Sequence, residues 1–138
     1  MSETSTITPQ AKLVGSQAQA LMCELATWSN TTTIILHGGC VFEFKGPFPK
    51  GSVGDGYYNL DGSAPGFHGH INLKVIDHIV FQDRPHRGRE SYAFCFQNKD
   101  SDNIFKVFLG RDADDELIAE QVEAFQRIKE SLQVTAAD

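Results

Sequence analysis

The stretch "TTTIILHGGCVFEFKG", residues 31–46, decides the fold of this 138-residue chain. Its two halves are rich in β-branched and aromatic residues, which suit the pleated, half-buried surface of a strand. Gly38 and Gly39 separate the halves, and a Gly-Gly pair between two such runs is a strong hairpin signal. We therefore expect two antiparallel strands here, joined by a tight turn.

Further strands follow at short intervals along the chain. In "SYAFCFQNK" the residues Tyr92, Phe94 and Phe96 share one face, because side chains alternate along a strand. This segment and "NIFKVFLG" form a second predicted hairpin across "DSDN". The segments 46–56 and 61–69 are rich in glycine and proline and are expected to be loops. The predicted strands are residues 31–37, 40–46, 56–60, 70–77, 78–83, 91–99 and 103–110.

Apolar residues recur at helical spacing near both ends of the chain. The first stripe runs from Leu13 to Trp28 and predicts an amphipathic helix of about four turns, with Thr8 as its cap and Pro9 at its first position. The second runs from Leu117 to Leu132 behind an acidic segment, in which Asp112 or Asp114 can cap the helix.

These elements predict an α+β fold, with a large antiparallel β-sheet flanked by N- and C-terminal helices. We expect one domain over residues 11–132, a flexible N-terminus at 1–10 and a flexible tail at 133–138. Helices on one side leave the second sheet face uncovered, and both faces look fairly apolar. Such a face needs a partner subunit or a large flat ligand.

Composition excludes several classes of protein. Hydrophobic residues make up 41% of the chain and charged residues 22%, which is a globular composition. A net charge of −6 does not suit nucleic acid, which needs a basic surface. Neither a signal-peptide pattern nor an apolar run of about 20 residues is present, so we expect a cytoplasmic chain without membrane insertion. The three cysteines lack a C-x-x-C pair and are expected to be small buried residues.

The residue chemistry leaves the site open. His68 and His70 lie on one side of an extended segment, where they form either a metal site or an ordinary exposed pair. His37 stands beside Gly-Gly, where a ligand can approach the backbone. Arg87 and Arg89 belong either to a charged hairpin tip or to a clamp for a carboxylate or phosphate. Neither an H-E-x-x-H zinc motif nor a G-x-S-x-G elbow occurs.

The order of the motifs adds to this interpretation. The segments "WSNTTTIILHGGCVFEFKGPFPKG", "GYYNL", "GHI", "DRPHRGRES" and "FKVFLGRD" follow one another along the chain. Together they resemble the cytosolic haem-utilisation carriers of the HutX/ChuX/HuvX type, which are related to the HemS/ChuS family. The resemblance runs from about Leu21 to about Leu132. It implies a haem-binding protein that pairs as a homodimer, two subunits resembling the two halves of a HemS-type protein.

The resemblance also points to particular residues. The histidine of "GHI" is His70, which is the first choice for the haem iron ligand. The family's other histidine falls on Leu36, and its neighbour His37 faces the opposite side of a regular strand unless a bulge near Gly38 restores the direction. His68 is an alternative ligand. Side chains that could cover the haem ring or pair with its propionates are Tyr57, Phe67, Phe94, Phe96, Arg84, Arg87 and Arg89.

The function that these resemblances imply is an intracellular haem carrier, which sequesters haem and delivers it, with a haem-degrading enzyme as a candidate recipient. The carrier itself is expected to be non-catalytic. Two alternatives stay open: a haem-degrading monooxygenase of the HemS/ChuS kind, and a binding domain for another apolar ligand.

Overall fold

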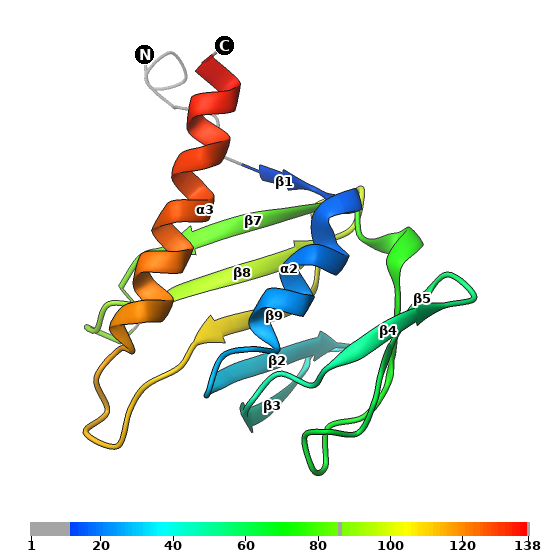
Figure 1. Ribbon diagram of the computed structural model, residues 1–138, viewed down its shortest axis with the longest axis horizontal. Helices are drawn as coiled ribbons and strands as arrows, with labels where there is room; N and C mark the ends of the chain where they lie inside the picture. The colour runs from blue at the N-terminus through cyan, green and yellow to red at the C-terminus, as the bar shows by residue number, and fades with distance from the viewer. Residues whose placement is uncertain (1–11, 86, 138) are drawn as a thin grey trace.

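The computed structural model describes residues 12–85 and 87–137, with side chains up to Leu132. In this part of the chain, antiparallel strands form two sheets, and two α-helices lie across one face of the larger sheet (Figure 1). The larger sheet has the strand order β1-β7-β8-β9-β2-β3, with β1 Lys12–Val14, β7 His78–Asp83, β8 Tyr92–Gln97, β9 Asn103–Leu109, β2 Thr31–His37 and β3 Cys40–Gly46. The smaller sheet is β4 Gly51–Gly54, β5 Tyr57–Leu60 and β6 His70–Asn72.

The β2–β3 hairpin that the sequence predicts is confirmed. Its register runs without interruption from Thr31 opposite Gly46 to His37 opposite Cys40. Gly38 and Gly39 have φ angles of 59° and 82°, which matches a two-residue type I′ turn with both central residues in the left-handed region. The turn therefore fixes which residues of β2 and β3 lie opposite one another.

The core lies between the larger sheet and the helices α2 (Ala18–Leu25) and α3 (Ala119–Ala137). Phe94 on β8 is at its centre, with its ring 5.0 Å from Phe125 of α3, 5.4 Å from Phe81 and 6.1 Å from Trp28. Phe94 and Phe96 are fully buried, which confirms the face predicted for this strand. Tilted and edge-on aromatic contacts thus hold α3 on this side of the sheet.

The N-terminal helix is shorter than predicted. Lys12–Val14 form β1, which pairs with β7 and places Leu13 opposite Ile79. The backbone N–H of Gly15 donates to the carbonyl of Asp77 at 2.8 Å, and a Cβ at Gly15 would collide with that carbonyl and its neighbour. A 3₁₀ turn, Gly15–Gln17, then leads into α2. The predicted cap at Thr8 and Pro9, and the flexible segment 1–10, lie outside the described residues.

The C-terminal helix begins later than predicted and extends further. Asp112 does not cap it: its Oδ1 accepts from the backbone N–H groups of Asp114 and Glu116, which closes a loop before the helix. Arg111 pairs with Leu117 across this loop. The helix starts at Ala119 and its backbone continues to Ala137, beyond the expected end at residue 132.

The middle of the chain also differs from the prediction. Residues 51–54, expected to be loop, form β4, and the strand predicted over 70–77 ends at Asn72, where the 3₁₀ turn Leu73–Val75 begins. Both changes follow from pairing with β5, which builds the small sheet.

The uncovered face of the larger sheet is less apolar than expected. Val80, Ala93 and Cys95 form a small buried cluster with Phe108, but polar side chains lie between such residues. Lys106, for example, donates to the Gln82 side chain at 3.0 Å. The prediction of buried cysteines is correct for Cys95 and wrong for Cys23 and Cys40, which are exposed. No helix within the described residues is long and apolar enough to cross a membrane.

Candidate functional site

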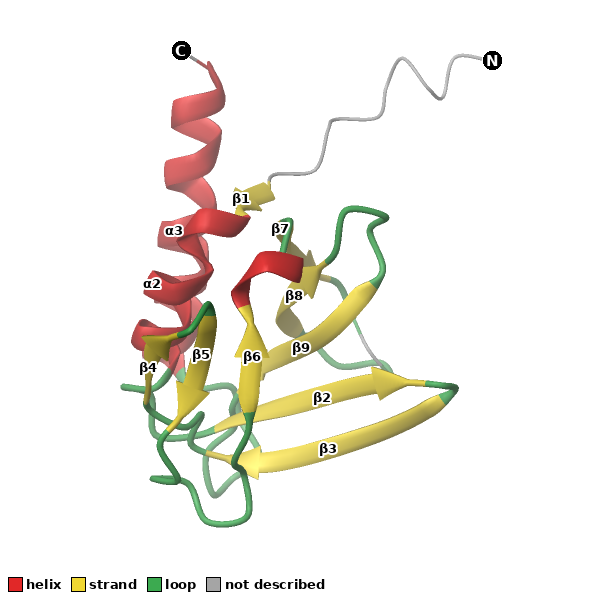
Figure 2. Cartoon of the chain, turned by 90° about the vertical axis from the view of Figure 1, so that its right-hand side faces the viewer, coloured by secondary structure: helices red, strands yellow, loops and turns green. Residues whose placement is uncertain are grey.

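The small sheet and the loop that leads into β6 present two histidines to solvent. Along β5, Tyr58 and Leu60 are buried against the core, so the alternate residues Tyr57 and Asn59 face outward. His70 on β6 pairs with Asn59 and faces the same way. Figure 2 shows β5 and β6 side by side. We call the outward surface formed by Tyr57, Asn59, His68 and His70 the histidine face.

His70 has a defined environment on this face. Its Nδ1 lies 2.7 Å from the Oδ1 of Asn59. The ring of His68 lies edge-on to it, with the ring centroids 5.6 Å apart and the planes at 79°. Both imidazoles are exposed, and Tyr57, diagonal to His70 across the two strands, is 39% exposed. The structure therefore brings together three of the residues that the sequence proposed: Tyr57, His68 and His70.

Phe67 supports the histidine face from below. Its ring stacks on Phe44 of β3 at 4.7 Å and meets the edge of Phe48 at 5.8 Å. Phe67 is half-buried and packs against the core, one position before the exposed His68. It therefore anchors the loop that leads into β6 and ties the small sheet to the β2–β3 hairpin.

His37 stands apart from the other histidines. It is exposed at the end of β2, and the uninterrupted β2–β3 register contains no bulge that would turn it to the side of Leu36. Among the described residues, no hydrogen bond or ring contact joins His37 to His68 or His70. The nearby apolar side chains on the hairpin are exposed, Phe42 by 52% and Val41 by 58%.

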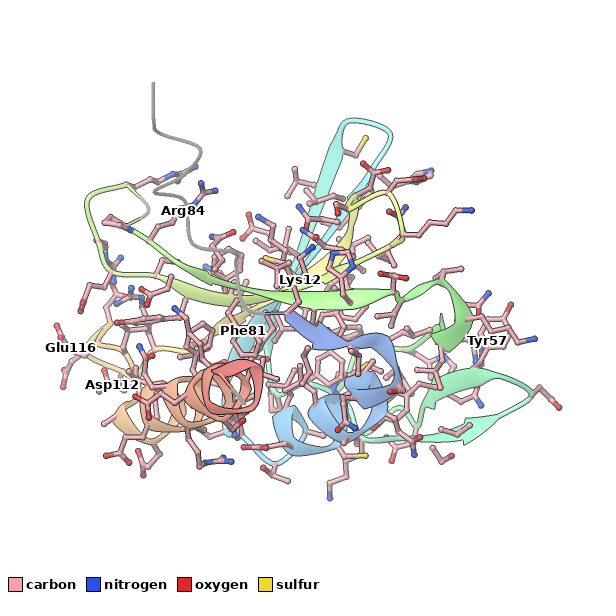
Figure 3. The ribbon with its side chains drawn as sticks, turned by 90° about the horizontal axis from the view of Figure 1, so that it is seen from above. Lys12, Tyr57, Phe81, Arg84, Asp112 and Glu116 are labelled. Carbon is pink, nitrogen blue, oxygen red and sulfur yellow. The ribbon has the colours of Figure 1, made fainter. Side chains whose placement is uncertain are left out.

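Arg87 and Arg89 lie at the other end of the molecule. Figure 3 shows Arg84, from the same β7–β8 loop, and Tyr57 at opposite ends of the structure. Both arginines line a cavity of about 470 Å³ on the uncovered face of the larger sheet. The other lining residues include Thr32, Ile34, Glu43, Lys45, Phe108 and Arg111. The structure thus separates these arginines from the histidine face within one chain.

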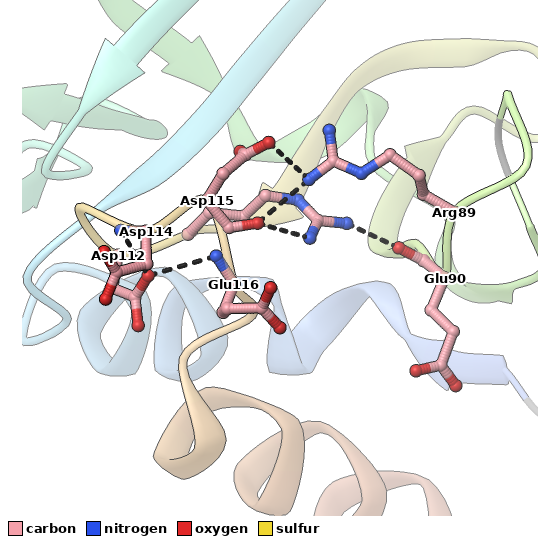
Figure 4. A network of polar contacts seen from close by, with 7 residues as sticks. Arg89, Glu90, Asp112, Asp114, Asp115 and Glu116 are labelled. Carbon is pink, nitrogen blue, oxygen red and sulfur yellow. Dashed lines mark hydrogen bonds and ion pairs between the residues drawn. The ribbon is translucent and has the colours of Figure 1, made fainter.

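Charged side chains beside this cavity connect the β7–β8 loop to the segment between β9 and α3 (Figure 4). Arg89 binds the Asp115 carboxylate at 2.7 Å and also donates to the Asp115 carbonyl at 2.9 Å. Arg111 donates to the same carbonyl at 3.1 Å and to the Glu90 carbonyl at 2.6 Å. Arg87, in the left-handed region at φ 55°, forms no polar contact with any described residue.

Sequence reasoning missed Asn59 as a member of the site. The only signal was its position in "GYYNL", two residues after Tyr57 and therefore on the same strand face. The described residues contain no group of three His, Cys, Asp or Glu side chains suited to a metal ion. The histidine face offers single imidazole ligands on an open surface.

The fold and the site define a small α+β protein. Helices cover one face of its larger antiparallel sheet, and exposed histidines lie at the small sheet beside it. The chain belongs to the haem utilisation ChuX/HutX family, whose model matches residues 11–128. This confirms the resemblance drawn from the motifs.

Individual relatives agree with this assignment. The chain is 45% identical over 116 residues to the intracellular heme transport protein HutX of Vibrio cholerae. The matched segment covers 84% of this chain and 60% of HutX. It therefore spans less than two thirds of that relative. A crystal structure of an Erwinia carotovora protein is similar with a TM-score of 0.82 and 33% identity, covering 89% of this chain and 76% of the other.

The heme binding protein ChuX has a similar structure, with a TM-score of 0.79, 29% identity, and coverage of 96% of this chain and 88% of ChuX. The Escherichia coli O157:H7 heme degrading enzyme ChuS shares the fold alone: the TM-score is 0.67 at 18% identity, over 87% of this chain and 37% of ChuS. The prediction of a ChuS-like α+β fold is confirmed.

Proposed function

We propose that this chain binds haem inside the cell and carries it to a recipient, with His70 as the iron ligand. The family supports this function, since HutX is named as an intracellular heme transport protein and ChuX as a heme binding protein. The observation that carries the assignment to His70 is its exposed imidazole on the histidine face, held at Nδ1 by Asn59 while no described residue forms a hydrogen bond with Nε2.

The residues around His70 fit a loosely held flat ligand. A neutral imidazole nitrogen is an ordinary axial ligand of haem iron. Tyr57 offers an exposed aromatic ring beside it, and His68 offers a second imidazole within reach of the same surface. Because this surface is open, one side of a bound haem stays accessible, which suits transfer to another protein.

The site that we propose does not include the arginines of the same chain. In the proposed arrangement a haem on the histidine face does not contact Arg87 or Arg89 of the same chain, because these residues line the cavity on the uncovered face of the larger sheet. Arg84, from the same loop, lies at the opposite end of the structure from Tyr57 (Figure 3). His37 is likewise separate, on the β2–β3 hairpin. The proposal therefore rests on His70, with His68 as the substitute ligand, and assigns neither His37 nor the two arginines to the same bound haem in one subunit.

We also propose that two copies pair. The match covers 37% of ChuS, so two copies would account for about three quarters of that protein's length. The exposed Phe42 and Val41 are candidate contacts, since large exposed apolar side chains on one element are typical of interaction surfaces. Light scattering after size exclusion tests this: a dimer mass that Phe42→Asp reduces to a monomer agrees, and a monomer mass for the unaltered protein contradicts it.

Two assays separate a carrier from a haem-degrading enzyme. We expect the haem complex to keep its Soret band in the presence of a reductant and oxygen, and to pass haem to apomyoglobin added in excess. Loss of the Soret band with release of iron would show degradation instead. Retention of haem in the presence of apomyoglobin would contradict a role in delivery.

A further inference from the structure

We propose that Asn59 is a positioning residue for the haem ligand, which fixes the tautomer of His70 so that Nε2 meets the iron. This inference rests on the proposed function, because it concerns the same histidine. It assigns a role to a side chain on the neighbouring strand that reaches haem only through His70.

The contact between the two side chains is directional. Asn59 and His70 are paired across β5 and β6, and the Asn59 Oδ1 lies 2.7 Å from His70 Nδ1. The amide end of Asn59 is fixed as well, because its Nδ2 lies 3.3 Å from the Gly54 carbonyl and 3.5 Å from the Tyr57 carbonyl. Both carbonyls only accept hydrogen bonds, so the amide nitrogen faces them and the amide oxygen faces His70.

This arrangement determines where the imidazole proton sits. Asn59 Oδ1 can only accept, so His70 Nδ1 must carry the proton and donate it. In the neutral imidazole, the lone pair is then on Nε2, which is free to bind iron. Histidines that ligate metals generally donate their other N–H to such an acceptor, which fixes the tautomer and the ring orientation.

The choice of an amide over a carboxylate agrees with a carrier. A carboxylate at this position would draw the Nδ1 proton more strongly and make the imidazole a stronger ligand. The amide oxygen of Asn59 orients the ring with a neutral hydrogen bond, so the iron bond is directed but not strengthened to the same degree. This favours both capture of haem and its later release.

The test compares haemin titrations of the unaltered protein, Asn59→Leu, Asn59→Asp and His70→Ala, followed by the Soret band. Asn59→Leu should weaken haemin binding by about 10-fold to 100-fold, the usual effect of removing an outer-shell partner of a metal ligand. Asn59→Asp should bind at least as tightly as the unaltered protein, since it keeps the acceptor. In the His70→Ala background, Asn59→Leu should have no further effect, because Asn59 acts through His70.

A matched control is an asparagine away from the histidine face. Asn30 donates from Nδ2 to the Arg111 carbonyl at 3.0 Å beside the cavity that Arg87 and Arg89 line, so Asn30→Leu should lose local stability without changing haemin affinity. Nitrogen NMR of the haem-free protein gives an independent readout: the His70 ring should be protonated at Nδ1 and should lose that preference in Asn59→Leu.

The outcomes separate this inference from the proposed function. If His70→Ala binds haemin like the unaltered protein, the assignment of the ligand to His70 fails. If His70→Ala is weakened while Asn59→Leu is folded and unchanged in affinity and spectrum, His70 stays the ligand and the role of Asn59 is refuted. An equal loss in Asn30→Leu would also refute it, since the effect would then be structural.

Discussion

Gln121 offers the sharpest stability test of the connection between α3 and the larger sheet. It is buried, with 3% exposure. Its Oε1 accepts from the Gly110 backbone N–H at 2.7 Å, and its Nε2 donates to the Asn30 carbonyl at 2.8 Å. One side chain thus joins the start of α3 to the end of β9 and the residue before β2.

Gln121→Leu would leave both backbone groups without a partner. A buried group that loses its partner costs about 1–3 kcal/mol, so the two together lower the free energy of unfolding by about 2–6 kcal/mol. This loss is a large part of the free energy of unfolding of a typical domain, which is about 5–15 kcal/mol. Urea unfolding followed by the fluorescence of Trp28 measures the change. A free energy of unfolding within about 0.5 kcal/mol of the unaltered protein, as for a surface substitution, would refute the reasoning.

Gln121→Glu separates the two hydrogen bonds. An ionised carboxylate still accepts from the Gly110 N–H but cannot donate to the Asn30 carbonyl, and its buried charge adds a desolvation cost, so Gln121→Glu is expected to lose stability at neutral pH. Burial raises the pKa of this carboxyl in the folded state, and the protonated form regains the donor. The deficit should therefore shrink as the pH falls through that pKa. A deficit that is the same at all pH values would contradict this explanation.

Three further predictions concern the core and its titrating groups. Phe94→Ala should lower the free energy of unfolding by about 3–5 kcal/mol in urea, because the ring is fully buried against three others; a loss below about 1 kcal/mol would contradict the packing described. Burial and its contact with Cys23 raise the pKa of Tyr58 from 10.0 to about 12, so the stability that its neutral hydroxyl provides is present below pH 10 and is lost as the pH rises toward 12. Tyr58→Phe should lose less stability over that range than the unaltered protein, and an equal loss would refute the assignment. A thiol reagent should modify the exposed Cys23 and Cys40 quickly and Cys95 only after unfolding, since burial also raises the pKa of the Cys95 thiol; three fast thiols would contradict this.

The hairpins could be predicted because their signals are local. Gly38 and Gly39 lie between two strand-like runs, and the alternation around Phe94 places the aromatic rings on one face. The short β1 could not be found in this way, because Leu13 fits the apolar spacing of the following helix equally well. Its strand conformation depends on pairing with β7, which is more than sixty residues away in the sequence.

In the candidate site, too, some residues could be predicted from local patterns and others depend on distant pairing. The alternation of side chains and the motif resemblance together pointed to His70 and Tyr57, and the structure places both on the histidine face. Asn59 was missed because its contact depends on the register between β5 and β6, which no local pattern sets. Arg87 was grouped with the histidines because chemistry alone connects arginine to propionates; the structure places it beside the cavity on the uncovered face of the larger sheet.

The most direct test of the account is a haemin titration of the unaltered protein against His70→Ala, with His37→Ala as the matched control on the β2–β3 hairpin. For the unaltered protein we expect a Soret shift that saturates at one haem per chain. His70→Ala should bind haemin at least about 10-fold more weakly and with an altered spectrum. His37→Ala should keep the affinity and the spectrum of the unaltered protein. The same affinity and spectrum in His70→Ala as in the unaltered protein would contradict the central claim that His70 holds the haem iron.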